Sequence, residues 1–298
     1  MMPTHSSMPG VDALWPLCLD IVAQRRGLAA PQQWDAGAPM AWDVAQGFAL
    51  RGMWNDEAVE LFELLKPLLD RPRHGAPWLI GQLGQSLDGC VATHGGDSNY
   101  VNGSEVLVHL HRLRALCDAV IVGAGTAAID DPQLTTRHVT GAHPVRVLLD
   151  PDLRLPTTLR VFSDGHAPTL LVCDASRASE AAARVGVEHV LGVTGLTGSD
   201  GALHLHALTA ALKARGLHVL FVEGGGVTVS RFIAQGCLDR LHLSVAPVII
   251  GAGRPGLQLP RSVAMRDCMR PAGRVFRMGA DVLWDLDLRT TQPAAARN

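Results

Sequence analysis

The chain has 298 residues, 47% of them hydrophobic and 18% charged, with a formal net charge of −2; this suits one large or two ordinary globular domains with a substantial core. No basic stripe indicates nucleic-acid binding, and no stretch reaches the roughly eighteen apolar residues of a membrane span or resembles an export signal. The six cysteines lie far apart and form no C-x-x-C pair, so a reducing cytoplasm fits best.

Residues 1–76 are predicted to form a helical extension that ends in a linker. Residues 55–70 show helical spacing of apolar residues, with acidic residues in the first turn. The segment RPRHGAP at 71–77 follows, and its proline and glycine residues break a continuing helix. We expect a separate domain over residues 77–289 and a disordered tail over residues 290–298.

From Trp78 onward, short apolar runs alternate with helical segments. The expected strands lie at 78–83, 118–123, 145–150, 169–174, 188–193, 218–223 and 241–250. The expected helices lie at 103–117, 176–186, 205–216 and 228–236. Unbroken runs of Val, Ile and Leu separated by helices indicate an α/β fold with a mostly parallel central sheet flanked by helices. Because ligands bind such sheets beyond the carboxyl ends of the strands, we expect the loops that follow strands to form the site.

Three of these loops are rich in glycine. Residues 86–103, SLDGCVATHGGDSNYVNG, fit either a surface hairpin or a loop that contacts a ligand. Residues 122–137 contain G-x-G at 123–125 but lack the third glycine of a dinucleotide fingerprint, so a standard Rossmann site is not expected. In residues 222–232, Glu223 ends a strand and three glycines begin a helix. That arrangement fits either a tight turn or a pyrophosphate site at the helix N-terminus.

Two histidine pairs raise the question of a metal site. His109 and His111 fall within one predicted helix, where residues two apart point to different faces. His204 and His206 form the second pair, and neither pair has a third ligand at a recognisable spacing. We therefore expect no metal site, and we expect these histidines to be solvated or to lie in the core.

Six motifs follow one another between residues 77 and 287. They are SLDG (86–89), GGDSNYVNG (95–103), LRALCDAVIVGAGTAAIDDPQLTTR (113–137), PVRVLLDPDLRLP (144–156), VEGGG (222–226) and APVIIGAG (246–253). In this order they resemble the reductase domain of bacterial riboflavin biosynthesis, also called the pyrimidine reductase or RibD C-terminal domain. The resemblance implies a dihydrofolate-reductase-like fold, NADPH as cofactor and a homodimer.

The resemblance also implies roles for individual residues. Substrate contacts are expected from Ser98, Arg114, Leu134, Arg137 and Glu223. Cofactor contacts are expected from Gly84, Tyr100, Thr126, Asp130, Gly225, Gly226, Val227 and Thr228, with Tyr100 at a place where some members have Trp. Glu223 and Asp130 are the predicted catalytic residues, and Glu223 is expected to hydrogen-bond sugar hydroxyls rather than to transfer a proton. Arg114 and Arg137 suit charge-assisted hydrogen bonds to a substrate phosphate, whereas Arg154 and Arg177 are candidates for a cofactor 2′-phosphate.

The implied reaction is NADPH-dependent reduction of 5-amino-6-(5-phosphoribosylamino)uracil to the ribitylamino product, so the expected partner is a small phosphorylated molecule. Residues 1–76 contain neither the H-x-E nor the P-C-x-x-C motif of the zinc deaminase that usually accompanies this domain. We therefore expect a reductase without a deaminase domain. Two alternatives stay open: a reductase of a pterin or another heterocycle, since fold does not fix function, and a non-catalytic nucleotide-binding module.

Overall fold

The computed structural model describes residues 8–30, 34, 37–98 and 101–289. The predicted disordered tail at 290–298 lies outside the described residues. The chain divides into two compact units, Met1–Gly75 and Ala76–Asn298. Within the described part, no helix is long and apolar enough to cross a membrane.

The first unit combines two helices with a β-hairpin. Its elements are α1 (Val11–Arg25), β1 (Met40–Asp43), β2 (Gly47–Leu50) and α2 (Asp56–Leu69). Helix α2 was predicted from its apolar spacing, and it begins where the Asn55 side chain accepts a hydrogen bond from the Ala58 N–H at 2.9 Å. The hairpin was not predicted, because each strand has only four residues. Its turn depends on Asp43, whose carboxylate accepts hydrogen bonds from the backbone N–H groups of Ala45 and Gln46. It also depends on Gly47, which has φ +75°.

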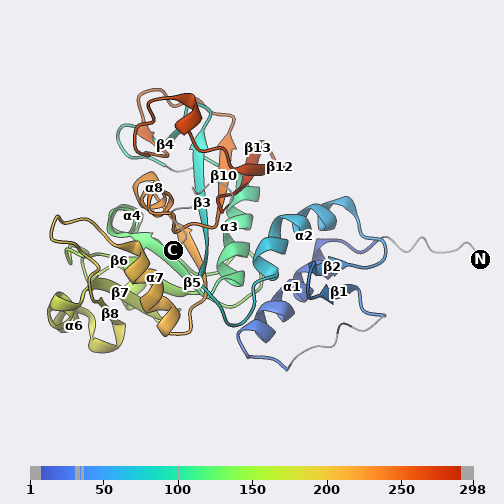
Figure 1. Ribbon diagram of the computed structural model, residues 1–298, viewed down its shortest axis with the longest axis horizontal. Coiled ribbons are helices and arrows are strands. Elements are labelled where there is room, and N and C mark those ends of the chain that lie inside the picture. The colour runs from blue at the N-terminus through green and yellow to red at the C-terminus, as the bar shows by residue number, and fades with distance from the viewer. Residues whose placement is uncertain (1–7, 31–33, 35–36, 99–100, 290–298) are drawn as a thin grey trace, which may run out of the picture. The chain divides into compact units, whose positions relative to one another are not determined.

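The second unit is built on a nine-stranded sheet (Figure 1). Its strands, in sheet order, are β12 (Ala272–Met278), β13 (Asp281–Asp287), β10 (Arg240–Ala246), β3 (Trp78–Ser86), β9 (Val219–Glu223), β5 (Ala119–Gly123), β6 (Val145–Leu149), β7 (Thr169–Asp174) and β8 (Val190–Val193). The strands from β10 to β8 pair in parallel, whereas β13 and β12 are antiparallel. The predicted mostly parallel central sheet is confirmed.

Helices cover both faces of this sheet. They are α3 (Ser104–Leu116), α4 (Ala124–Asp130), α5 (Arg160–Ser163), α6 (Ala178–Val185), α7 (Leu205–Ala214) and α8 (Gly226–Ala234), with short 3₁₀ turns at Ala175–Arg177, Val187–His189 and Met265–Asp267. On one face, α7 and α8 bury Leu208 and Phe232 in a core that includes Leu241 of β10. His242 follows Leu241 in β10, and neighbouring strand residues point to opposite faces. The hydrogen bond between His242 and His109 of α3 therefore places α3 on the other face of the sheet.

Two features near the end of the chain differ from the prediction. The strand expected at 241–250 ends at Ala246, because Pro247 has no N–H to extend the ladder. Strands β12 and β13 were not predicted. Strand β12 lies at the sheet edge, and most of its residues are exposed, so it lacks a clear apolar alternation. A small two-stranded sheet, β4 (Cys90–Ala92) with β11 (Arg254–Pro255), stands apart from the main one.

A buried polar network lies between α3 and the antiparallel edge. His109 Nε2 lies 2.9 Å from His242 Nδ1, and His242 Nε2 lies 3.3 Å from the Asp285 carboxylate. Asp285 also accepts hydrogen bonds from Arg240 and Arg274. Burial lowers the pKa of both histidines, and it contributes most to each shift. These histidines therefore belong to the core in their neutral form, one of the two outcomes expected for His109.

Candidate active site

The carboxyl ends of the parallel strands open onto a cavity of about 1870 Å³. Residues from β3, β5, β9 and β10 line it, together with residues from α4 and α8. A pocket for one drug-sized ligand has about 300–1,000 Å³, so this cavity has room for two small ligands side by side. This is the edge of the sheet at which the sequence predicted the site.

Glu223 is held at this cavity by a bidentate ion pair. It is the last residue of β9, and its carboxylate accepts hydrogen bonds from Arg114 Nε at 2.8 Å and Arg114 Nη2 at 2.5 Å. Arg114 lies in the last turn of α3, is 5% exposed, and also donates to the Thr135 carbonyl at 2.9 Å. Such a paired geometry fixes the orientation of the carboxylate as well as its charge. Glu223 is therefore a rigid acceptor in the cavity wall.

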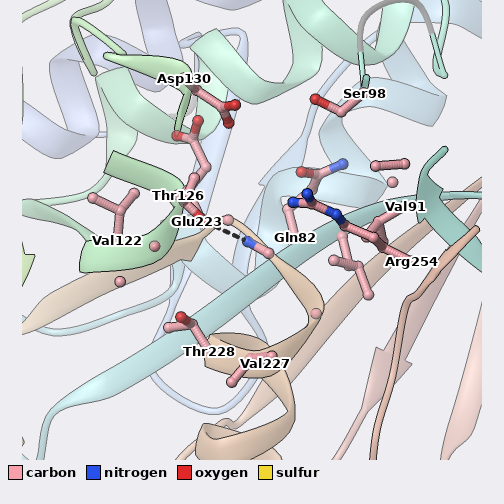
Figure 2. A pocket seen from close by; sticks show the side chains of 18 of the residues that line it. Gln82, Val91, Ser98, Val122, Thr126, Asp130, Glu223, Val227, Thr228 and Arg254 are labelled. Carbon is pink, nitrogen blue, oxygen red and sulfur yellow. Dashed lines mark hydrogen bonds between the residues drawn. The ribbon is translucent and has the colours of Figure 1, made fainter. Parts of the chain in front are cut away.

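The N-terminus of α8 forms a glycine-lined part of the wall. Gly225 precedes the helix, and its N–H donates to the Thr126 hydroxyl at 3.1 Å, the bond drawn in Figure 2. A Cβ atom at Gly226 would lie 1.8 Å from the Gly256 carbonyl oxygen, so only glycine fits there. The first N–H groups of a helix have no partner within it, and they attract anions. Val227 and Thr228 complete the predicted cofactor run, and all four residues line the cavity.

Asp130 brings a second carboxylate to the same cavity. It is the last residue of α4, whose Thr126 also lines the wall. In Figure 2, the carboxylates of Asp130 and Glu223 lie on one side of the cavity. Desolvation raises the pKa of Asp130 and the Glu223 carboxylate raises it further, whereas the charge of Arg254 lowers it; the net shift is upward. Asp130 is therefore more easily protonated than an ordinary aspartate.

The loop at 86–103 lines the cavity through several of its residues. Ser98 is exposed and lies on the wall opposite Asp130 (Figure 2). Gly84, just before this loop in β3, also lines the cavity, and a Cβ atom there would lie 1.8 Å from Asn102 Oδ1. The sequence allowed either a surface hairpin or a loop that contacts a ligand. Its position in the cavity wall favours the second interpretation. Tyr100, a predicted cofactor contact, lies outside the described residues.

The remaining predicted substrate residues follow α4. Leu134 is buried, lines the cavity and has φ +57°, a strained conformation for leucine. Arg137 is exposed and donates to the Thr135 hydroxyl at 2.8 Å, while its backbone N–H donates to His111 Nδ1 at 2.8 Å. Neither Arg114 nor Arg137 is among the residues that line the cavity. Their role as phosphate ligands stays a prediction.

Some residues of the wall were not predicted. Gln82 of β3 is 5% exposed and faces the cavity, and a polar residue inside the apolar run WLIGQL was the signal that could have identified it. Arg254 faces the cavity from β11 (Figure 2), and no sequence pattern pointed to it. Arg154 lines the cavity, whereas Arg177 is paired with Glu180 and is not among the lining residues. Among the described residues, no cluster of three or more His, Cys, Asp or Glu side chains is arranged to hold a metal ion.

Similarity to solved structures defines the class of fold. The chain resembles RibD from Acinetobacter baumannii, with a TM-score of 0.61 and 24% identity over 78% of this chain and 62% of that one. It also resembles the riboflavin biosynthesis reductase Rib7 of Saccharomyces cerevisiae, with a TM-score of 0.59 and 17% identity over 76% of this chain and 99% of that one. The predicted dihydrofolate-reductase-like α/β fold is confirmed.

Similarity in sequence identifies the family. The family described as the RibD C-terminal domain matches residues 77–268. The riboflavin biosynthesis protein RibD of Bacillus amyloliquefaciens is 34% identical over 63% of this chain and 50% of that protein. A 2,5-diamino-6-ribosylamino-4(3H)-pyrimidinone 5′-phosphate reductase of Methanothermobacter thermautotrophicus is 35% identical over 70% of this chain and 96% of that protein. The chain belongs to the RibD C-terminal domain family, as predicted, and its match spans about half the length of the RibD relatives.

Proposed function

We propose that the protein is an NADPH-dependent reductase of riboflavin biosynthesis that reduces the ribosyl group of 5-amino-6-(5-phosphoribosylamino)uracil. The observation that carries this proposal is the pairing of a fixed carboxylate, Glu223, with a glycine-lined helix N-terminus at Gly225 and Gly226 in one large cavity. The names of the bacterial and archaeal relatives support it. The proposal requires the second unit alone, so residues 1–76 are left without a role in the chemistry.

The residues present fit a nicotinamide dinucleotide. A pyrophosphate needs backbone N–H groups that side chains do not obstruct, and Gly225 and Gly226 have no side chain at the N-terminus of α8. Gly84, Thr126, Asp130 and the run from Gly225 to Thr228 would hold the cofactor, which supplies a hydride when bound. The preference for NADPH over NADH is part of the proposal and comes from the family resemblance.

The chain's own residues would orient the sugar and move the proton. Reduction of an open-chain imine adds a hydride to C1′ and a proton to the neighbouring nitrogen. Glu223, fixed by Arg114, would accept hydrogen bonds from the sugar hydroxyls. Asp130, whose pKa is raised chiefly by desolvation, would donate the proton to that nitrogen. Ser98 and Leu134 would contact the substrate from the cavity wall.

A second candidate substrate differs at the pyrimidine ring. The archaeal relative is named for the 2,5-diamino-pyrimidinone compound, and the match to this chain covers 96% of it. That compound has an amino group at the ring position where the uracil has an oxygen. The sugar chemistry is the same for both, so the same cavity residues would serve either substrate.

Purified protein tests this proposal directly. NADPH oxidation would be followed with the uracil substrate, the 2,5-diamino substrate and a dihydropterin, each offered separately. Turnover with either ribosylamino-pyrimidine phosphate supports the proposal, and the ratio of kcat/KM values identifies the preferred ring. Turnover with the dihydropterin alone would overturn it. A homodimer, which the family resemblance implies, is proposed as well and is tested by sedimentation equilibrium.

A further inference from the structure

Arg254 is a cation without a protein partner in the cavity wall. It lies on β11, and its side chain makes no hydrogen bond or ion pair with any residue in the described part of the chain. Figure 2 shows its side chain near Gln82 and Ser98, on the side of the cavity opposite the carboxylates of Asp130 and Glu223. Its charge reaches Asp130, whose pKa it lowers, but the two do not form an ion pair.

The backbone around Arg254 is fixed by three neighbouring segments. Arg254 pairs with Ala92 of β4. Two residues later, the Gly256 N–H donates to the Gly89 carbonyl at 2.8 Å. Further on, the Gln258 N–H donates to the Ser230 hydroxyl of α8 at 2.7 Å. Arg254 is therefore held in place relative to the N-terminus of α8.

The loop after β4 leaves space for the guanidinium. A Cβ atom at Gly96 would lie 2.6 Å from Arg254 Nη2 and 2.8 Å from its Cζ. Gly96 also has φ +92°, a conformation that favours glycine. The side chain thus packs directly on the backbone of the loop that carries Ser98.

The cavity carboxylate Glu223 does not neutralise the charge of Arg254, so a ligand can do so. Glu223 is already paired with Arg114 at 2.5 Å. Arg254 is exposed to water, and a ligand that covers its guanidinium would have to supply a partner, because a desolvated charge without one is costly. The N-terminus of α8 favours negative charge in the same cavity.

We propose that Arg254 binds a phosphate group of a ligand in this cavity. This inference rests on the proposed function, in which both the cofactor and the substrate carry phosphates. A guanidinium donates two parallel hydrogen bonds to phosphate oxygens, which makes arginine the residue best suited to this contact. The sequence predicted Arg114 and Arg137 as phosphate ligands, and Arg254 is a further arginine that lines the cavity itself.

Binding measurements on the full chain separate the two sources of the phosphate. Isothermal titration calorimetry would measure NADPH binding, and then ribose 5-phosphate and ribose binding to the NADPH-saturated protein. The variants are Arg254→Ala, Arg254→Lys and, as a charge-matched control outside the cavity, Arg277→Ala. Losing a hydrogen bond to a charged group weakens binding by at least about tenfold. Arg254→Ala should therefore lower the affinity for NADPH or for ribose 5-phosphate by at least that factor. Arg254→Lys should restore part of the loss, and Arg277→Ala should stay within about twofold because distant exposed charges are screened.

Each outcome decides the proposal. A loss confined to NADPH assigns the phosphate to the cofactor, and a loss confined to ribose 5-phosphate assigns it to the substrate. Unchanged binding of both ligands to Arg254→Ala overturns the proposal, as does an equal loss for ribose, which has no phosphate. If the wild-type protein does not bind ribose 5-phosphate, the NADPH measurement decides alone. If the wild-type protein does not bind NADPH either, the proposed function fails first, and the inference about Arg254 fails with it.

Discussion

Replacing Arg114 by alanine should destabilise the protein strongly, because it would leave the Glu223 carboxylate without its partner. The side chains of Arg114 and Glu223 are only 6% and 13% exposed, so water replaces the guanidinium incompletely. Two hydrogen bonds to a charged group are lost, along with the bond to the Thr135 carbonyl. Breaking a buried ion pair by removing one partner costs about 3–5 kcal/mol, and we expect Arg114→Ala to lower the free energy of unfolding by this amount.

Urea denaturation at pH 7 would measure the effect, with Arg154→Ala as the matched control. Arg154 lies 3.4 Å from Asp152, and both side chains are more than half exposed, so its loss should cost at most about 1 kcal/mol. The double variant Arg114→Ala/Glu223→Ala should cost less than the sum of the two single variants, because the second change removes the unpaired carboxylate. A cost for Arg114→Ala equal to that of the control, or strict additivity in the double variant, would refute this reasoning.

Three further predictions concern the helix N-terminus and the buried histidines. Gly226→Ala should reduce NADPH affinity at least about tenfold, because the new Cβ atom forces the backbone apart; calorimetry showing an unchanged Kd would contradict it. Thr126→Val should lower the affinity for NADPH by about tenfold, since the Gly225 N–H loses its acceptor. Calorimetric titration with NADPH checks this as well. Burial lowers the pKa of His109 and His242, and it lowers that of His111 to about 3. These histidines are therefore protonated at a lower pH in the folded protein than in the unfolded chain. The free energy of unfolding should fall as the pH drops below about 6.5, by up to about 1.4 kcal/mol per pH unit for each histidine. Urea midpoints that stay constant from pH 7 to 5 would rule this out.

The sequence predicted those parts of the site that lie next to each other along the chain. Glu223 and the glycines after it fall within one motif, and strand ends in a parallel sheet gather at one edge. The position of the cavity therefore followed from local patterns. The same holds for α2 and for the central strands, whose apolar runs are long and unbroken.

Contacts between distant segments could not be predicted in this way. The bond between Arg114 and Glu223 joins residues 109 positions apart, and no local pattern indicates that these two residues form an ion pair. Arg254 reaches the cavity only because β11 pairs with β4, two short strands without a recognisable pattern. Strand β12 escaped prediction because an exposed edge strand lacks the apolar alternation of a half-buried one.

The most direct test of the account is single-turnover reduction of the phosphorylated ribosylamino-uracil by the purified protein. The NADPH used would carry deuterium at both C4 positions of the nicotinamide. The account predicts that NADPH is oxidised and that the ribityl product carries deuterium at C1′, with the rate strongly reduced in Glu223→Gln. NADPH that binds but is not oxidised with either ribosylamino-pyrimidine phosphate, or a product labelled on the ring instead of the sugar, would contradict the proposed function.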